Sequence, residues 1–342
     1  MEDFKKVMSS KFEMKDLGLV EYVVGLRVES TKNMTHLSQS LYGQDILKRF
    51  NLQDSNTAKT PLPERTILYP KGPNEEEGDS TVYRSMVGSL MYSMLGSRPD
   101  LAFTVGQLSR HLHACTSKLI QSAEQVFRYL KYTIDDGLSY TYTGPNDKTS
   151  RRKAVFVTGY SDADWAGDVE DSKSTSGYII TMANAPIIWK SMKQKSVAKS
   201  STEAETAAAD SCTNEVIWVR GMLDFFGFPQ KHPTELFMDN VSAIKGIQNG
   251  NTTQRNKFFR VRMDAMHNSH MDNEIKFLWM KTDLLPADAL TKSLSGPTLL
   301  KHKRFMNLVP ISHGLKGRVG TDCSHGKSKV GAQTVTHETV NV

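Results

Sequence analysis

The alternation of short apolar runs and long amphipathic segments over residues 155–293 limits the possible folds more than any other feature of the sequence. Predicted strands occupy residues 155–162, 177–182, 186–191, 235–239 and 275–280. Predicted helices occupy residues 202–227, 241–248 and 286–293. Three strands, a helix, a strand, helices, a strand and a final helix are the order of a mixed α/β domain.

The chain of 342 residues is long enough for two domains, and its composition changes along its length. Residues 1–142 combine strand-like segments, a Pro-containing loop and an amphipathic helix predicted at 118–134. A polar break at 143–153 predicts a linker, so we expect the α/β domain to span residues 154–309. Residues 310–342 are rich in Gly, Ser, Thr, Lys and His, which predicts a disordered tail.

Composition argues against a membrane or secreted protein. No run approaches the roughly 18 consecutive apolar residues of a membrane span, and the N-terminus lacks the apolar core of a signal peptide. Cys115, Cys212 and Cys323 form neither a disulfide framework nor a zinc-binding pattern. We therefore expect an intracellular protein, cytoplasmic or nuclear and not secreted, with no membrane partner and no small-molecule cofactor.

Four acidic residues are expected at the ends of the predicted elements. Asp162 and Asp239 end strands, whereas Glu205 and Asp288 lie in the first turns of helices. Strand ends and helix starts on one side of an α/β sheet can converge in space. Clustered carboxylates repel one another unless cations neutralise them, and such hard ligands suit Mg²⁺, with Mn²⁺ as an alternative. Two such ions can activate water and stabilise the leaving oxygen of a phosphodiester.

Structural explanations exist for most of these acids. Thr202 and Glu205 have the spacing of a capping box at a helix N-terminus. Asp239 can cap the helix that follows it, and Asp288 can complement a helix dipole. Asp162 is the hardest to explain in this way, because Asp is disfavoured in a β-strand.

Six sequence blocks in this region occur in a recognisable order. They are Gly159-Tyr-Ser-Asp-Ala-Asp-Trp-Ala-Gly-Asp168, Ser172-Lys-Ser-Thr-Ser-Gly-Tyr178, Trp189-Lys-Ser-Met-Lys-Gln194, Ser200-Ser-Thr-Glu-Ala-Glu205, Asp239-Asn-x-Ser-Ala-Ile244 and Ala287-Asp-x-Leu-Thr-Lys292. Together they resemble the ribonuclease H domain of copia-type LTR retrotransposon Pol polyproteins. The resemblance implies a ribonuclease H-like fold, which is a mixed five-stranded sheet with flanking helices. It also implies catalytic, metal-binding roles for Asp162, Glu205, Asp239 and Asp288.

The first region is similar to the end of the reverse transcriptase in the same polyproteins. The matching blocks include Phe12-Glu-Met-Lys-Asp-Leu-Gly18, Tyr83-Arg-Ser-Met-Val-Gly-Ser-Leu-Met-Tyr92 and Arg98-Pro-Asp100. The family's polymerase needs a paired-aspartate Y-x-D-D turn just upstream of the first block, and this chain begins after that turn. The resemblance therefore implies an α+β reverse-transcriptase remnant over residues 1–142, without polymerase activity of its own.

Two basic stretches that lack acidic residues flank predicted metal ligands. The residues expected to contact nucleic acid are Lys190, Lys193, Lys195, Lys199, Arg255, Lys257, Arg260 and Arg262. Such patches would neutralise the two backbones of an RNA·DNA hybrid, and the RNA strand would be recognised through its 2′-hydroxyls. An ordinary solvated basic face is the alternative explanation.

The second basic stretch departs from the family pattern. Phe258 and Asp264 stand where the family has histidines, and Arg260 stands where it has an acid. None of these changes removes a predicted metal ligand. They do alter the segment that is expected to face the substrate.

The leading hypothesis is therefore a ribonuclease H that cleaves the RNA strand of RNA·DNA hybrids with two Mg²⁺ ions, within a truncated polyprotein. The competing hypothesis is an inactive retrotransposon relic or a nucleic-acid-binding module that retains the fold. A third hypothesis is that the orphaned polymerase end exposes an apolar surface and the chain aggregates. The sequence leaves open whether the domain is active and how many copies assemble.

Overall fold

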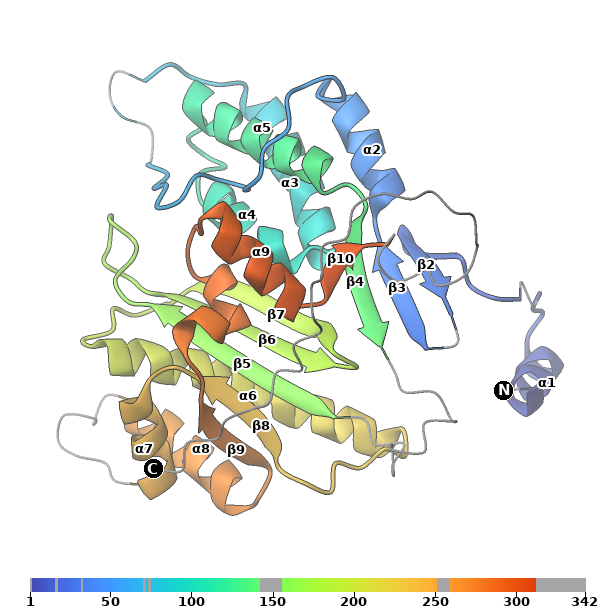
Figure 1. Ribbon diagram of the computed structural model, residues 1–342, viewed down its shortest axis with the longest axis vertical. Coiled ribbons are helices and arrows are strands. Elements are labelled where there is room, and N and C mark those ends of the chain that lie inside the picture. The colour runs from blue at the N-terminus through green and yellow to red at the C-terminus, as the bar shows by residue number, and fades with distance from the viewer. Residues whose placement is uncertain are drawn as a thin grey trace, which may run out of the picture.

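The computed structural model describes residues 2–15, 18–31, 33–69, 72, 75–141, 156–250 and 259–311, and all structural statements below concern these residues. The linker predicted at 143–153 lies outside them, as does the tail predicted at 310–342 except for its first two residues. The described residues form two five-stranded sheets, each accompanied by helices (Figure 1).

The first sheet is antiparallel, with the strand order β1-β2-β3-β4-β10. Its strands are β1 (Tyr22–Val23), β2 (Leu26–Ser30), β3 (Met34–Ser38), β4 (Asp136–Thr141) and β10 (Leu308–Pro310). The helices before β4 are α1 (Glu2–Lys11), α2 (Ser40–Arg49), α3 (Ser80–Gly96), the 3₁₀ helix η1 (Pro99–Leu101), α4 (Ala102–Ser109) and α5 (Ser117–Tyr132). α5 forms where an amphipathic helix is predicted, and Ala123 and Phe127 of its apolar stripe are fully buried.

The second sheet is mixed, with the strand order β7-β6-β5-β8-β9. Its strands are β5 (Val157–Asp164), β6 (Thr175–Met182), β7 (Ala185–Lys193), β8 (Thr234–Met238) and β9 (Ile275–Trp279). The first three strands pair antiparallel, whereas β8 and β9 run parallel to β5. This arrangement confirms the predicted fold class, a ribonuclease H-like mixed five-stranded sheet with flanking helices.

The helices of this part of the chain include one at each of the three predicted places and further ones at residues 260–271, 282–284 and 296–305. They are α6 (Ser201–Phe225), α7 (Val241–Asn249), α8 (Arg260–Met271), the 3₁₀ helices η3 (Thr282–Leu284) and η4 (Pro286–Leu290), and α9 (Gly296–Phe305). The helix predicted at 286–293 is a short 3₁₀ helix instead of the start of an α-helix. It ends at Leu290, and the backbone amide of the next residue, Thr291, donates to the carbonyl of Asp288.

The two faces of the second sheet are covered by different parts of the chain. On β6, Tyr178 and Ile180 pack in a core with Cys212 of α6, as the period-two alternation of a strand requires. Ile179, between them, points the other way and is completely buried in the core built by α3, α4 and α5. The first region therefore supplies the cover for one face of the second sheet.

Polar contacts between the two sheets, and a late strand that pairs in the first sheet, also join the two regions of the chain. The indole nitrogen of Trp189 on β7 donates to the carbonyl of Met94 on α3 at 3.0 Å, and the hydroxyl of Tyr140 on β4 donates to the carbonyl of Pro186 at 2.6 Å. The last described strand, β10, returns to pair with β4 of the first sheet. The division of the chain by a linker at residues 143–153 stays a prediction. The residues before this segment pack extensively against those after it.

No helix in the described ranges is both long enough and apolar enough to cross a membrane.

Candidate metal centre

Asp162 lies inside the central strand of the second sheet. β5 continues two residues beyond it to Asp164, so the prediction that Asp162 ends the strand is wrong by those two residues. It pairs with Gly177 of β6, and it is only 3% exposed. A buried Asp within a central strand has no role in forming the strand, which agrees with the difficulty of explaining it structurally.

Glu205 approaches Asp162 from helix α6. The residue that caps this helix is Ser200, whose hydroxyl accepts from the backbone of Glu203, while the carboxylate of Glu203 accepts from the backbone of Lys199. The capping box is therefore Ser200 with Glu203, and the alternative explanation of Glu205 as a capping residue is wrong. Glu205 instead accepts a hydrogen bond from the backbone of Ala163 on β5 at 3.2 Å.

Asp239 follows the last residue of β8 and is half-buried. The cap of α7 is its neighbour Asn240, whose side chain accepts from the backbone of Ala243 at 2.9 Å. The alternative explanation of Asp239 as a helix cap is therefore wrong. One oxygen of Asp239 accepts from the hydroxyl of Thr282 at 2.6 Å, which orients the carboxylate at the end of the strand.

These three acids form one compact cluster. Asp162, Glu205 and Asp239 each offer a carboxylate oxygen, and these atoms all lie within 4.8 Å of one another. The Oε2 atom of Glu205 is buried and has no hydrogen-bond partner in the described part of the chain. A buried carboxylate oxygen without a donor is costly unless a cation takes the donor's place. The cluster therefore fits a hard divalent cation such as Mg²⁺.

The electrostatics of the cluster favour protons when no cation is bound. Burial and the nearby Asp288 raise the pKa of Asp162 above its usual value. Burial, Asp162 and Asp239 together raise the pKa of Glu205 above its usual value. Repelling carboxylates of this kind release their protons readily only when a cation joins them.

The fourth predicted acid, Asp288, lies next to this cluster but outside the compact group. It is buried at 4% exposure on η4, and its carboxylate pairs with Lys292 at 2.5 Å. The imidazole of His302 on α9 lies 3.7 Å from its other oxygen. Lys292 already neutralises the charge of Asp288. The role of Asp288 as a metal ligand stays a prediction, because only the other three acids form the compact group.

Three residues that were not predicted from the sequence complete the surroundings of the cluster. Thr291, Lys292 and His302 each lie within 3.7 Å of a carboxylate oxygen of Asp162 or Asp288. Thr291 and Lys292 belong to the Ala287-Asp-x-Leu-Thr-Lys292 block, so their presence in that block was the available signal. His302 had no such signal, since α9 brings it to the site only through tertiary packing.

Half of the predicted basic residues are lysines of β7 and the segment after it. Lys190, Lys195 and Lys199 are exposed, whereas Lys193 forms ion pairs with Asp168 at 2.7 Å and with Asp171 at 2.9 Å. The positive charge of Lys193 is thus neutralised within the protein.

The second basic stretch is only partly described. Arg255 and Lys257, together with the substituted Phe258, lie outside the described residues. On α8, Arg260 pairs with Asp264 at 3.3 Å, and Arg262 lies 3.5 Å from Asp210 of α6. Both arginines are exposed, so these pairs are weak and compete with solvent.

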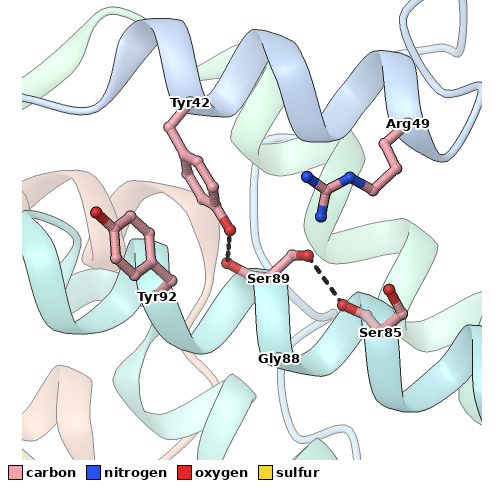
Figure 2. Close-up of a pocket in the computed structure, with 6 residues that line it drawn as sticks. All are labelled: Tyr42, Arg49, Ser85, Gly88, Ser89 and Tyr92. Atoms are coloured by element: carbon pink, nitrogen blue, oxygen red, sulfur yellow. Dashed lines mark hydrogen bonds between the residues drawn. The ribbon is translucent and has the colours of Figure 1, made fainter. Parts of the chain in front are cut away.

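A separate hollow lies between α2 and α3, away from the four acids. Its volume is about 400 Å³, and it is lined by Tyr42, Arg49, Ser85, Gly88, Ser89 and Tyr92 (Figure 2). The hydroxyl of Tyr42 donates to the carbonyl of Ser89 at 3.2 Å, which links the two helices across it.

Metal-free protein is expected to lose stability as the pH rises from about 7.5 to 8.5. The raised pKa values of Asp162 and Glu205 mean that the native state holds protons which the unfolded state has released, so the unfolding free energy falls with rising pH. Buried histidines with lowered pKa values, such as His36, are almost entirely neutral in both states above about pH 7.5, because the ordinary histidine pKa is 6.5, so they contribute little over this range. Calorimetric melting temperatures in EDTA would check this, and Mg²⁺ should reverse the trend. A melting temperature in EDTA that rises with pH would contradict it.

Comparisons with known proteins agree with the resemblance of the sequence blocks. The family model of the reverse transcriptase (RNA-dependent DNA polymerase) matches residues 1–64. The chain is 36% identical over 292 residues to the retrovirus-related Pol polyprotein from transposon TNT 1-94 of Nicotiana tabacum, covering 83% of this chain and 21% of that protein. It is 31% identical over 307 residues to the Pol polyprotein from transposon RE2 of Arabidopsis thaliana, covering 89% of this chain and 20% of that protein.

Among solved structures, the chain is similar to LC11-RNase H1, isolated from compost, with a TM-score of 0.32 and 13% identity. That match covers 40% of this chain and 92% of the other. The chain spans about one fifth of the length of the two Pol polyproteins that it matches. Its sequence blocks and its similarity to the Pol relatives over most of its length together show that the chain belongs to the family of copia-type retrotransposon Pol polyproteins.

Proposed function

We propose that this chain is a metal-dependent ribonuclease that hydrolyses the RNA strand of RNA·DNA hybrids. The observation that carries the proposal is the cluster of Asp162, Glu205 and Asp239, whose carboxylate oxygens lie within 4.8 Å of one another. The buried, unpartnered Oε2 atom of Glu205 supports the binding of a divalent cation there. Membership of the Pol family supports a nucleic-acid substrate.

The residues of the cluster have distinct parts in this proposal. Asp162, held inside a central strand, and Glu205, on the helix facing it, orient the attacking water. Asp239, at the end of the neighbouring strand β8, is a third metal ligand, and Asp288 on η4 is a fourth. Bound divalent ions would lower the pKa of that water and stabilise the charge that develops on the leaving oxygen.

Exposed lysines supply the expected contacts to the hybrid. Lys190 on the edge strand β7 and Lys195 just after it are both exposed, and no ion pair to either is found in the described ranges. Phosphate contacts of this kind position a nucleic acid without reading its sequence. Binding is therefore expected to weaken as salt increases.

A labelled RNA·DNA hybrid, incubated with the purified protein and Mg²⁺, tests the proposal. Cleavage of the RNA strand is expected in Mg²⁺ and not in EDTA, while duplex DNA of the same sequence stays intact. The Asp239→Asn variant is the matched control, because it keeps the volume of the side chain and removes its charge. Cleavage by the wild type no greater than that of this variant would refute the catalytic proposal.

One observation favours a second candidate, a nucleic-acid-binding module without catalysis. Arg260 and Asp264, which both depart from the family pattern, pair with each other on α8. The segment expected to face the substrate therefore has a different charge arrangement. Hybrid binding that persists in EDTA, together with an intact RNA strand in Mg²⁺, would favour this candidate.

A further inference from the structure

Thr291 makes a direct contact with the acid cluster. Its hydroxyl donates to Oδ2 of Asp162 at 2.5 Å, across 129 residues of sequence. The carbonyl of Asp288, at 3.0 Å, is a second acceptor, but a hydroxyl has only one proton, and the carboxylate is closer and would carry a charge once a cation is bound. Thr291 is completely buried, so no solvent competes for this hydrogen bond.

We propose that Thr291 is a positioning residue for the metal site, which fixes the carboxylate of Asp162 for the cation. The inference rests on the proposed metal-dependent function. A hydrogen bond to Oδ2 fixes the rotation of the Asp162 carboxylate, which a cation would otherwise have to fix on binding. Partners that orient a ligand in this way are worth about 10–100-fold in metal affinity.

The approach of Thr291 to Asp162 depends on the absence of a side chain on β6. Gly177, which pairs with Asp162 across the sheet, lies against η4 and the residue that follows it. A Cβ atom at Gly177 would lie 2.8 Å from Cβ of Leu290, 2.8 Å from Cγ2 of Thr291 and 3.0 Å from the carbonyl of Ala287. These distances are too short for any other residue, so η4 rests on the sheet only because this position is glycine.

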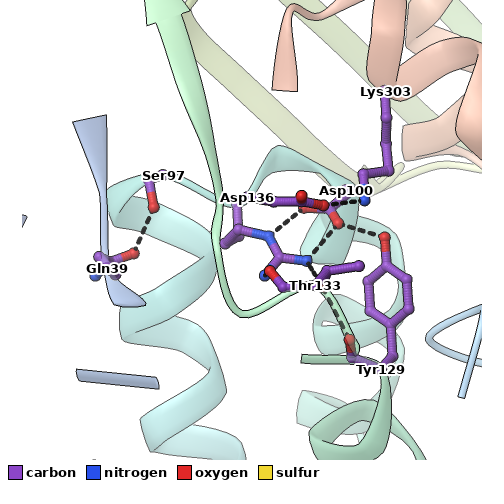
Figure 3. A network of polar contacts seen from close by, with 8 residues as sticks. Gln39, Ser97, Asp100, Tyr129, Thr133, Asp136 and Lys303 are labelled. Carbon is purple, nitrogen blue, oxygen red and sulfur yellow. Dashed lines mark hydrogen bonds and ion pairs between the residues drawn. The ribbon is translucent and has the colours of Figure 1, made fainter. Parts of the chain in front are cut away.

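The other side of η4 is anchored in the first region. Ala289 and Leu290 belong to the core that α3, α4 and α5 form, and Leu290 is completely buried there. The helix that follows, α9, is held to β4 by a buried ion pair between Lys303 and Asp136 (Figure 3). Thr291 is therefore held from both sides, by the second sheet and by the core of the first region.

The test is the affinity of the full chain for Mn²⁺ alone, measured by titration calorimetry. Thr291→Val removes the hydroxyl and keeps the shape, and we expect it to bind about tenfold more weakly. Thr291→Ser keeps the hydroxyl and should bind within about twofold of the wild type, a difference far below the loss expected for valine. A residue with only a packing role would give the opposite order, because serine loses a buried methyl group and valine does not. Equal affinities of the valine variant and the wild type would overturn the inference.

A second pair of variants tests the close approach of η4. Gly177→Ala should weaken Mn²⁺ binding about as much as Thr291→Val, because the added methyl group displaces Thr291. Gly221→Ala on α6 is the matched control, since its Cβ would meet nothing within 4 Å. Unchanged Mn²⁺ affinity in Gly177→Ala would overturn the inference.

These outcomes are distinguishable from failure of the proposed function. A wild-type protein that binds Mn²⁺ and loses affinity in Thr291→Val, yet leaves the hybrid intact, would refute the ribonuclease and support the positioning role. A protein that cleaves the hybrid, with Thr291→Val binding Mn²⁺ like the wild type, would refute only the positioning role. A wild-type protein that binds no Mn²⁺ would overturn the positioning role directly.

Discussion

Arg98→Met is expected to lower the free energy of unfolding by about 3–5 kcal/mol, because it leaves a buried carboxylate without its partner. Arg98 is 2% exposed, and its guanidinium donates to both oxygens of Asp100, at 3.0 and 2.8 Å. It also donates to the side chain of Thr133 at 2.6 Å, and the hydroxyl of Tyr129 donates to Asp100 at 2.6 Å (Figure 3). Methionine keeps the length of the side chain and supplies none of these hydrogen bonds.

The pKa of Asp100 shows how strongly the network acts. Burial alone would raise it, but Arg98, with help from Lys303 and Tyr129, holds it below its usual value. In Arg98→Met this pKa should move above its usual value, so part of the lost stability should return at low pH. Urea unfolding followed by tryptophan fluorescence at pH 7 and at pH 5 would measure both effects.

The double variant Arg98→Met with Asp100→Leu is the control for this prediction. Replacing a buried ion pair by apolar residues of similar size is often neutral, whereas removing one partner is not. The double variant should therefore recover most of the stability that Arg98→Met loses. A single variant within about 1 kcal/mol of the wild type would contradict the prediction, since ordinary surface changes fall in that range.

Glu205→Gln is expected to have two opposite effects. Hybrid cleavage should fall about 100-fold or more, because a metal ligand matters at least as much as the residues that orient it. Metal-free stability at pH 8 should rise by about 1–2 kcal/mol, as is common when a strained site residue is replaced. The amide is neutral without taking up a proton, whereas the buried Glu205 must take one up beside Asp162 and Asp239, and the amide oxygen can still accept from Ala163.

The pH dependence of the stability gain identifies its cause. The raised pKa of Glu205 costs stability only above its ordinary value of 4.5, so the advantage of the glutamine variant should vanish near pH 4. Glu203→Gln, at the exposed N-terminus of α6, is the matched control and should leave cleavage unchanged. Glu205→Gln protein that is less stable than the wild type in EDTA at pH 8 would contradict the electrostatic account.

The order of strands and helices could be predicted because its signals are local. A short apolar run marks β6, and a three-to-four-residue spacing of apolar residues marks α5 and α6, whatever lies beyond them. The three clustered acids were found for a different reason. Glu205 and Asp239 alone have ordinary structural explanations and Asp162 is hard to explain in that way, but only their joint order in the sequence blocks pointed to one site.

Two overlapping capping patterns explain why the wrong capping residues were considered for the N-terminus of α6. The segment Ser200-Ser-Thr-Glu-Ala-Glu205 contains two overlapping capping boxes, and the sequence does not show which one is used. The structure uses Ser200 with Glu203, which turns Glu205 toward β5. A shift of two residues thus separates a capping role from a role in the acid cluster.

Contacts between segments that are far apart in the chain could not be predicted from the sequence. Lys193 was counted as a free cation because the basic stretch itself contains no acid, but Asp168 and Asp171 reach it from the loop after β5. The contact of Thr291 with Asp162 and the glycine that permits it depend on how η4 lies on the sheet. Such pairings have no periodic signature in a single chain.

The pairing of β10 with β4 affects the order in which the two sheets can be completed during synthesis. Leu308 lies opposite Leu138, and the side chain of Asn307 donates to the carbonyl of Ser139, 168 residues earlier in the chain. During synthesis, β4 therefore leaves the ribosome long before its neighbour exists, and one edge of it stays open meanwhile. Closing so large a loop is slow, so the first-made sheet is the last to be completed. A nascent chain stopped ahead of β10 would carry an unprotected edge to which other chains can add.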